Sequence, residues 1–132
     1  MKYNELIKEA LKYRERAYVP YSKFKVGAAV LMEDGNIYGG CNIENASFGA
    51  TNCAERTAIF KAVAEGNKKL KAIAVVGDLS TYTSPCGICR QVISEFGNKD
   101  TDIILIKNED DYIIKKIEEM LPEAFTKEDL EK

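Results

Sequence analysis

Histidine is missing from all 132 residues of this chain. Its absence excludes Ser-His and Cys-His nucleophile pairs, H-E-x-x-H metalloprotease sites and every metal site that uses an imidazole ligand. Proton transfer near neutral pH must then use a carboxylate, a lysine or cysteine of shifted pKa, or a water bound to a metal ion.

Long apolar runs and an excess of positive charge are also missing. No run of about 18 apolar residues occurs, so we expect no membrane span. The polar residues 1–5 lack the apolar core of a secretory signal. A net charge of −2 gives no basic footprint for nucleic acid. We therefore expect a cytoplasmic protein without membrane or nucleic-acid partners, in a compartment where thiols stay reduced.

The length of the chain predicts one globular domain, and its N-terminal pattern predicts a helix. The chain fits one domain over residues 1–132, with 45% apolar and 30% charged residues. Apolar residues recur at helical spacing over 3–17, which predicts an amphipathic helix. We expect Asn4 to cap this helix and Pro20 to end it.

A hairpin is predicted next. Residues 25–32 and 37–41 have the composition of strands, and Asp34-Gly35 between them is a turn signal. Gly39-Gly40 lacks the pattern of a phosphate-binding loop, so we interpret it as a bulge or a close backbone contact.

The remaining elements alternate between helix and strand. We expect helices at 53–65 and 86–96, buried strands at 70–77 and 102–106, and a short strand, helix and terminal turn at 112–114, 116–121 and 126–129. This order predicts an α/β sheet that is covered on both faces. The hairpin would make the sheet mixed, and we expect its second half to be parallel.

Four cysteines are the candidate metal ligands. Cys86 and Cys89 have the C-x-x-C spacing that lets two thiolates reach one ion, and Cys53 also lies at a predicted strand-to-helix junction. The alternatives are a redox dithiol or half of a structural zinc site. Because both helices would begin at these cysteines, their N-termini would lower the thiol pKa values, which favours a metal site. We expect Cys41 to pack in the core.

An acidic residue accompanies the cysteines. Three thiolates leave one position open on tetrahedral zinc, which is typical of a catalytic site. Glu55 can then carry protons for a water at that position, and a dry pocket would raise its pKa. Three thiolates also outweigh the charge of zinc, so Arg56 is a candidate compensator through hydrogen bonds to sulfur. The alternative for Arg56 is an exposed ion pair.

These motifs together resemble the cytidine deaminase family, in its small homotetrameric form. The resemblance is carried by residues 21–29, 42–49, 52–56, 85–91 and 121–125. It implies a three-layer α/β/α fold around a mixed five-stranded sheet and one Zn²⁺ per subunit of a homotetramer. It also implies hydrolysis of cytidine and 2′-deoxycytidine to uridine and 2′-deoxyuridine, with release of ammonia, in pyrimidine salvage. The implied zinc ligands and proton shuttle are Cys53, Cys86, Cys89 and Glu55.

The same resemblance implies the residues that bind substrate. Asn42 and Glu44 would hold the ribose 3′-hydroxyl, and Phe24 would pack on the nucleoside. The backbone N–H of Ala54 would bind the pyrimidine carbonyl, and Phe125 would reach into the site of a neighbouring subunit.

Three alternatives and one departure stand beside this interpretation. A structural zinc or redox domain would lack catalysis, and a deaminase of bases in nucleic acid would need a basic, stacking track for the strand. A deaminase of a nucleoside-like antibiotic would not need the pair Asn42 and Glu44. Phe48 stands where the family often has tyrosine, so a hydrogen bond from that hydroxyl is lost here.

Overall fold

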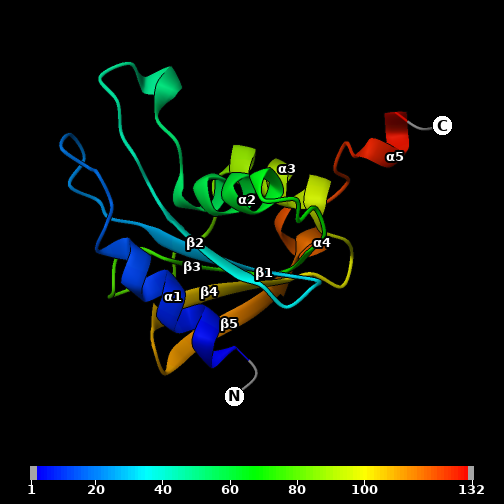
Figure 1. Cartoon of the computed structure of the whole chain (residues 1–132), viewed down its shortest axis with the longest axis horizontal. Helices are drawn as coiled ribbons and strands as arrows, with labels where there is room; N and C mark the ends of the chain where they lie inside the picture. The colour runs from blue at the N-terminus through cyan, green and yellow to red at the C-terminus, as the bar shows by residue number, and fades with distance from the viewer. Residues whose placement is uncertain (1–2, 131–132) are drawn as a thin grey trace.

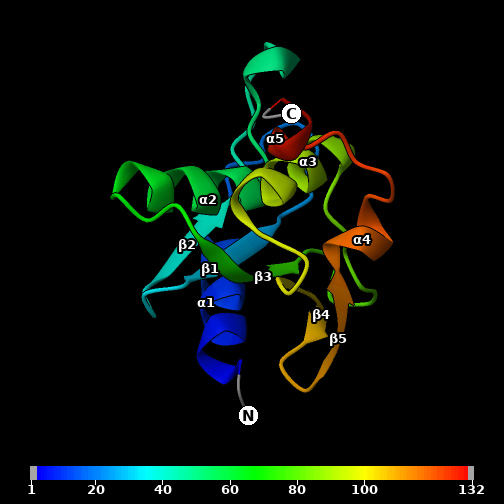
Figure 2. The same ribbon diagram turned by 90° about the vertical axis from the view of Figure 1, so that its right-hand side faces the viewer.

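The fold is known from a computed structural model that describes residues 3–130. Its elements in chain order are α1 (Asn4–Arg14), β1 (Gly27–Met32), β2 (Ile37–Cys41), the 3₁₀ helix η1 (Phe48–Ala50), α2 (Ala54–Ala64), β3 (Leu70–Val76), α3 (Gly87–Phe96), β4 (Asp102–Asn108), β5 (Asp111–Lys116), α4 (Ile117–Met120) and α5 (Lys127–Leu130). Helix α1 lies on one face of the sheet, and α2 and α3 lie on the other (Figures 1 and 2). The predicted three layers are therefore confirmed.

The five strands form one mixed sheet in the order β2-β1-β3-β4-β5. Strand β1 pairs antiparallel with both β2 and β3, and β3 pairs parallel with β4. The expectation of a parallel second half is wrong for β5, which pairs antiparallel with β4. Residues 109–110 connect these two strands, and a connection that short can only reverse the chain, because a parallel pair needs a long crossover.

Each face of the sheet has its own apolar core. In β3, Ile73 and Val75 pack toward the α2 and α3 side, whereas Ala72, Ala74 and Val76 pack toward α1. Burial on both faces explains why this strand is a nearly continuous apolar run in the sequence.

The first helix differs from its prediction at both ends. Tyr3, not Asn4, occupies the N-cap position, and no side chain caps this end. The helix ends at Arg14, well before Pro20. The backbone N–H of Tyr18 donates to Asn42 O at 3.0 Å, and this sheet-like contact takes the chain out of helical geometry before the proline is reached. Within residues 3–130, no helix is both long and apolar enough to cross a membrane.

Two glycines in β2 permit close approach of both helix layers. A Cβ on Gly39 would lie 2.2 Å from the ring of Tyr13 in α1, and one on Gly40 would lie 2.5 Å from the backbone nitrogen of Ala58 in α2. The pairing of β1 with β2 is regular through both residues. The predicted close backbone contact is confirmed, without a bulge, and it sets the position of α2 on the sheet.

Candidate active site

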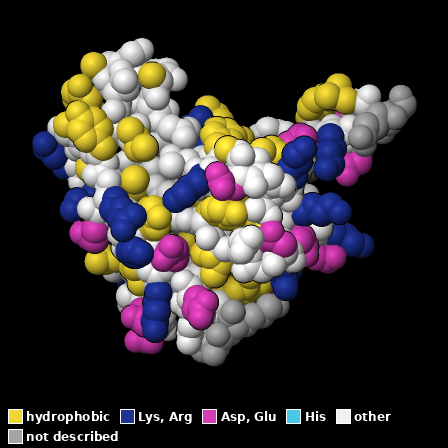
Figure 3. All heavy atoms as spheres, viewed as in Figure 1, with side chains coloured by type: hydrophobic (Ala, Val, Ile, Leu, Met, Phe, Trp, Pro, Cys, Tyr) yellow, Lys and Arg dark blue, Asp and Glu magenta, His cyan; other side chains and the backbone are white. Residues whose placement is uncertain are grey.

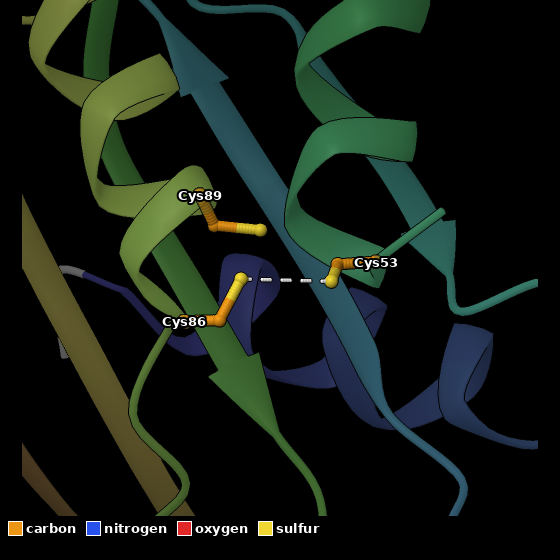
Figure 4. Close-up of side chains that lie close together, drawn as sticks. All are labelled: Cys53, Cys86 and Cys89. Atoms are coloured by element: carbon orange, nitrogen blue, oxygen red, sulfur yellow. Dashed lines mark hydrogen bonds between the residues drawn. The ribbon is translucent and has the colours of Figure 1, made fainter. Parts of the chain in front are cut away.

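The starts of α2 and α3 bring three thiols together. Cys53 is the N-cap residue of α2, Cys86 is the N-cap residue of α3, and Cys89 lies one turn into α3. Their Sγ atoms all lie within 4.8 Å of one another, and Figure 4 shows the three side chains pointing into the space between the two helices. Cys41 is buried elsewhere, with its thiol 3.5 Å from Arg16 O, as expected for a core cysteine.

The geometry of these thiols suits a zinc ion. Cys53 Sγ and Cys86 Sγ are 3.7 Å apart. Tetrahedral zinc with Zn–S bonds of about 2.3 Å separates its sulfur ligands by about 3.8 Å. Thiolates are soft ligands that select zinc over hard cations. The three cysteines can therefore hold a metal ion, and their number leaves one tetrahedral position for another ligand.

The surroundings of Cys53 favour its thiolate. Hydrogen bonds from Cys89, Arg56 and Cys86 lower the pKa of Cys53 to about 5, although burial opposes the shift. Arg56 Nη2 lies 3.2 Å from Cys53 Sγ. The same contacts to Cys53 and Cys89 raise the pKa of Arg56. Both helix N-termini add positive potential at this place, in addition to the charge of Arg56.

Glu55 lies beside this cluster in the first turn of α2. Its side chain is buried, with 4% of the residue exposed. Burial, reinforced by the negative charge of Cys53, raises the pKa of Glu55 to about 7, as the sequence predicted. A carboxyl with this pKa can both accept and donate a proton near neutral pH. Ala54 precedes it at the helix start, where backbone N–H groups have no partner within the helix.

The two polar residues that follow β2 hold the neighbouring loop. Asn42 Oδ1 accepts from the N–H of Val26 at 2.9 Å, and its amide nitrogen donates to Phe24 O at 2.8 Å. Glu44 Oε1 accepts from the N–H of Tyr21 at 3.0 Å. An amide nitrogen has a second N–H, and a carboxylate has further lone pairs. Both side chains therefore keep capacity for a ligand hydroxyl.

A pocket of about 360 Å³ adjoins Glu44. Its lining residues are Tyr21, Ser22, Glu44, Asn45, Phe48 and Thr51. The cysteines and Glu55 do not line it. Phe24 is half-exposed nearby, and its ring packs against the backbone of Gly77, where a Cβ would lie 3.0 Å from Phe24 Cζ.

Phe125 lies on the chain segment between α4 and α5. The residue is 62% exposed, and its carbonyl oxygen accepts a hydrogen bond from Gln91 Nε2 at 2.7 Å. The C-terminal segment projects from the body of the chain in Figure 1. The structure thus does not bring Phe125 to the pocket of its own chain.

Sequence reasoning missed two side chains near the site. Gln91, on α3, holds the carbonyl of Phe125, and nothing local in the sequence indicates that contact. Ser22 accepts from the N–H of Phe24 at 3.0 Å and donates to Glu44. The first of these bonds has a local signal, because serine often accepts from the backbone N–H two residues on in a turn.

Comparison with known proteins agrees with this site. Residues 1–105 match the family described as the cytidine and deoxycytidylate deaminase zinc-binding region. Cytidine deaminase of Sporosarcina psychrophila is 55% identical over 130 residues, which cover 98% of this chain and 96% of that protein. Cytidine deaminase of Burkholderia pseudomallei has a crystal structure that matches with a TM-score of 0.88 and 46% identity, over 95% of this chain and 100% of that one. The crystal structure of cytidine deaminase from Mycobacterium tuberculosis matches with a TM-score of 0.83 and 38% identity, over 95% of this chain and 98% of that one. The chain therefore belongs to the cytidine and deoxycytidylate deaminase zinc-binding family.

Proposed function

We propose that this chain is a zinc-dependent cytidine deaminase. It hydrolyses cytidine and 2′-deoxycytidine to uridine and 2′-deoxyuridine and releases ammonia, as one domain in the cytoplasm. The observation that carries the proposal is the cluster of three thiols beside a buried carboxyl, Glu55, whose pKa is raised to about 7. The name of the relative with 55% identity supports the choice of substrate.

Metal binding, proton transfer and charge compensation fall to different residues. Zinc held by Cys53, Cys86 and Cys89 would supply a Lewis acid that makes water a stronger acid. Glu55 accepts a proton from the attacking water and delivers it to N3 of the base. It then takes the proton of the new C4 hydroxyl, as the C4 carbonyl forms, and passes it to the amine, which leaves as ammonia. One carboxyl acts first as base and then as acid, so a pKa near neutrality suits both steps. Arg56 offsets the negative charge of the thiolates through its hydrogen bond to Cys53.

The substrate is held by groups before β1, after β2 and at the start of α2. Asn42 and Glu44 offer an N–H and carboxylate oxygens to the ribose 3′-hydroxyl, which can both accept and donate. Phe24 packs on the nucleoside, and the N–H of Ala54 binds the pyrimidine carbonyl. Glu44 is the charged residue of the pocket lining, and its carboxylate repels a nucleotide phosphate.

We extend the proposal to a homotetramer with one zinc per subunit. Two segments project on the α2 and α3 side: the loop that contains η1 and the C-terminal segment (Figures 1 and 2). Hydrophobic side chains gather on the projecting loop in Figure 3, where Phe48 is 82% exposed. Exposed apolar patches rimmed by polar groups mark interaction surfaces. Phe125 of one subunit would reach into the pocket of its neighbour and complete it.

One assay tests the activity. The zinc-loaded protein is incubated with cytidine, 2′-deoxycytidine, cytidine monophosphate, or a single-stranded cytosine-containing oligonucleotide, and ammonia release and loss of absorbance are followed. We expect both nucleosides to be converted, with no reaction of the monophosphate or the oligonucleotide. The proposal is wrong if neither nucleoside releases ammonia. Conversion of the oligonucleotide instead would indicate a deaminase of nucleic acid.

A further inference from the structure

The loop before β1 is held in a turn that its own backbone does not favour. Lys23 has a φ of 62°, in the left-handed region, although it is not glycine. Such a conformation costs of the order of 1 kcal/mol and persists only where neighbouring contacts impose it. One contact is local, from the N–H of Lys23 to Val19 O at 3.1 Å. The others come from residues 42–44.

Ser22 lies at the centre of these contacts. Its hydroxyl donates to Glu44 Oε2 and accepts from the N–H of Phe24 at 3.0 Å. A serine hydroxyl has a single O–H to donate, and Glu44 takes it. One side chain therefore joins the carboxylate proposed to bind the ribose to the aromatic residue proposed to pack on the nucleoside.

The contacts of Ser22 hold both oxygens of Glu44. Oε1 accepts from the N–H groups of Tyr21 and Ser22 at 3.0 and 3.1 Å, and Oε2 accepts from the Ser22 hydroxyl. With both oxygens held, the carboxylate cannot turn about its last torsion without breaking a hydrogen bond. These bonds, above all the one from the Ser22 hydroxyl, lower the pKa of Glu44, so the group remains an ionised acceptor.

Asn42 holds the same loop without help from Ser22. Its amide bonds Phe24 O and the N–H of Val26. Loss of the Ser22 hydroxyl would thus leave Phe24 attached through Asn42 while Oε2 of Glu44 lost its partner. Removal of the Ser22 hydroxyl should therefore disturb the position of the Glu44 carboxylate more than that of the Phe24 ring.

We propose that Ser22 is a positioning residue that determines selectivity for the 3′-hydroxyl of the nucleoside, acting through Glu44. This inference rests on the proposed function, in which Asn42 and Glu44 hold that hydroxyl. Ser22 itself need not touch the substrate. It fixes the direction of the carboxylate lone pairs that accept the hydrogen bond from the sugar.

The test compares cytidine with 3′-deoxycytidine, which lacks the hydroxyl in question. We expect the wild-type protein to prefer cytidine in kcat/KM, and Ser22→Ala to reduce that preference about tenfold, the size of one hydrogen bond to a charged group. The loss should appear as a higher KM for cytidine, with kcat, zinc content and kcat/KM for 3′-deoxycytidine nearly unchanged. A purely structural role would lower kcat/KM for both substrates alike.

Three variants serve as controls. Ser22→Thr keeps the hydroxyl and should keep the preference, and Ser22→Cys keeps the volume with a weak donor and should lie between. Ser80→Ala removes a comparable bond, Ser80 Oγ to Asp78 Oδ1 at 2.8 Å, away from the pocket. Ser80→Ala should leave the preference for cytidine over 3′-deoxycytidine unchanged.

The outcomes separate the two proposals. An unchanged preference in Ser22→Ala, or an equal loss on both substrates, overturns the role of Ser22. A wild-type protein that deaminates both substrates equally well overturns it too. A wild-type protein that deaminates neither overturns the proposed function instead.

Discussion

Glu55 has its chemical character because α2 begins at Cys53. The N-cap position of the cysteine places the glutamate in the first helical turn, where it is buried against the sulfur cluster. A helix shifted by one residue would point this side chain about 100° away, because 3.6 residues make one full turn. The raised pKa is thus a property of the position, not of glutamate itself.

The first prediction concerns this residue. Glu55→Gln keeps the size and polarity of the side chain but cannot carry a proton. We expect kcat for cytidine to fall by about 10²–10⁴-fold, while zinc content and the circular dichroism spectrum stay as in the wild type. A variant that retains near-normal kcat would show that another group moves the proton.

At the scale of elements, the contact of α2 with β2 sets the position of the whole centre. Gly40→Ala would place a methyl group 2.5 Å from Ala58 N and 2.8 Å from Ala54 O, both backbone atoms that cannot turn away. We expect a loss of about 1–3 kcal/mol in the free energy of unfolding, as for other overpacked sites, measured in urea.

The matched control is Gly49→Ala. An added Cβ there meets nothing within 4 Å, so the free energy of unfolding should change by less than about 0.5 kcal/mol. Equal stabilities for the two variants would contradict the close packing of α2 on the sheet.

Helix α1 is tied to β4 by a buried phenol. The Tyr3 hydroxyl donates to Asp102 Oδ2 at 2.5 Å, and burial together with this acid raises the pKa of Tyr3 from 10.0 to about 12. A raised pKa in the folded state means that the stabilisation is complete below pH 10 and is lost as the pH rises through 12. We expect the free energy of unfolding of the wild type to exceed that of Tyr3→Phe by about 1 kcal/mol at pH 8.

The pH dependence is the decisive part of that comparison. The advantage of wild type over Tyr3→Phe should shrink between pH 10 and 12 in urea unfolding experiments. A difference that stays constant over this range would mean that the hydroxyl does not titrate in contact with Asp102.

Local signals explain which elements could be predicted from the sequence. Gly66 ends α2 with a φ of 98°, and Gly35 turns the first hairpin with a φ of 92°, because each needs a conformation that other residues avoid. The direction of β5 was mispredicted, since it depends on a short connection that periodicity does not reveal. The end of α1 depends on the pairing of Tyr18 with Asn42, residues distant in sequence.

The site divides along the same line. The clustering of the three cysteines and the burial of Glu55 beside them could be predicted, because their spacing and the starts of two helices are local features. The bonds that Asn42 makes to Val26 and Phe24 could not, because they join segments that meet only after folding. The bonds from Ser22 to Glu44 and from Gln91 to Phe125 were missed for the same physical reason.

For the whole molecule, the prediction is that subunits complete one another. If Phe125 acts in a neighbouring site, Phe125→Ala should raise KM for cytidine about tenfold, through loss of an aromatic contact. Co-expressed Phe125→Ala and Glu55→Gln subunits should then regain activity. In a random tetramer, about a quarter of the sites would combine an intact Glu55 of one subunit with an intact Phe125 of its neighbour.

The opposite result has a clear meaning. If Phe125 served the site of its own chain, every site in the mixture would carry one defect, and the mixture would be no more active than the two variants apart. A monomer in analytical ultracentrifugation would also contradict shared sites.

X-ray absorption at the zinc edge of the purified protein tests the centre most directly. We expect three sulfur neighbours at about 2.3 Å and one oxygen or nitrogen neighbour for each zinc, with one zinc per chain. Four sulfur neighbours would mean that Cys41 closes the site, and fewer than three would mean that Cys53, Cys86 and Cys89 do not share one ion; either result contradicts a catalytic zinc held by these cysteines.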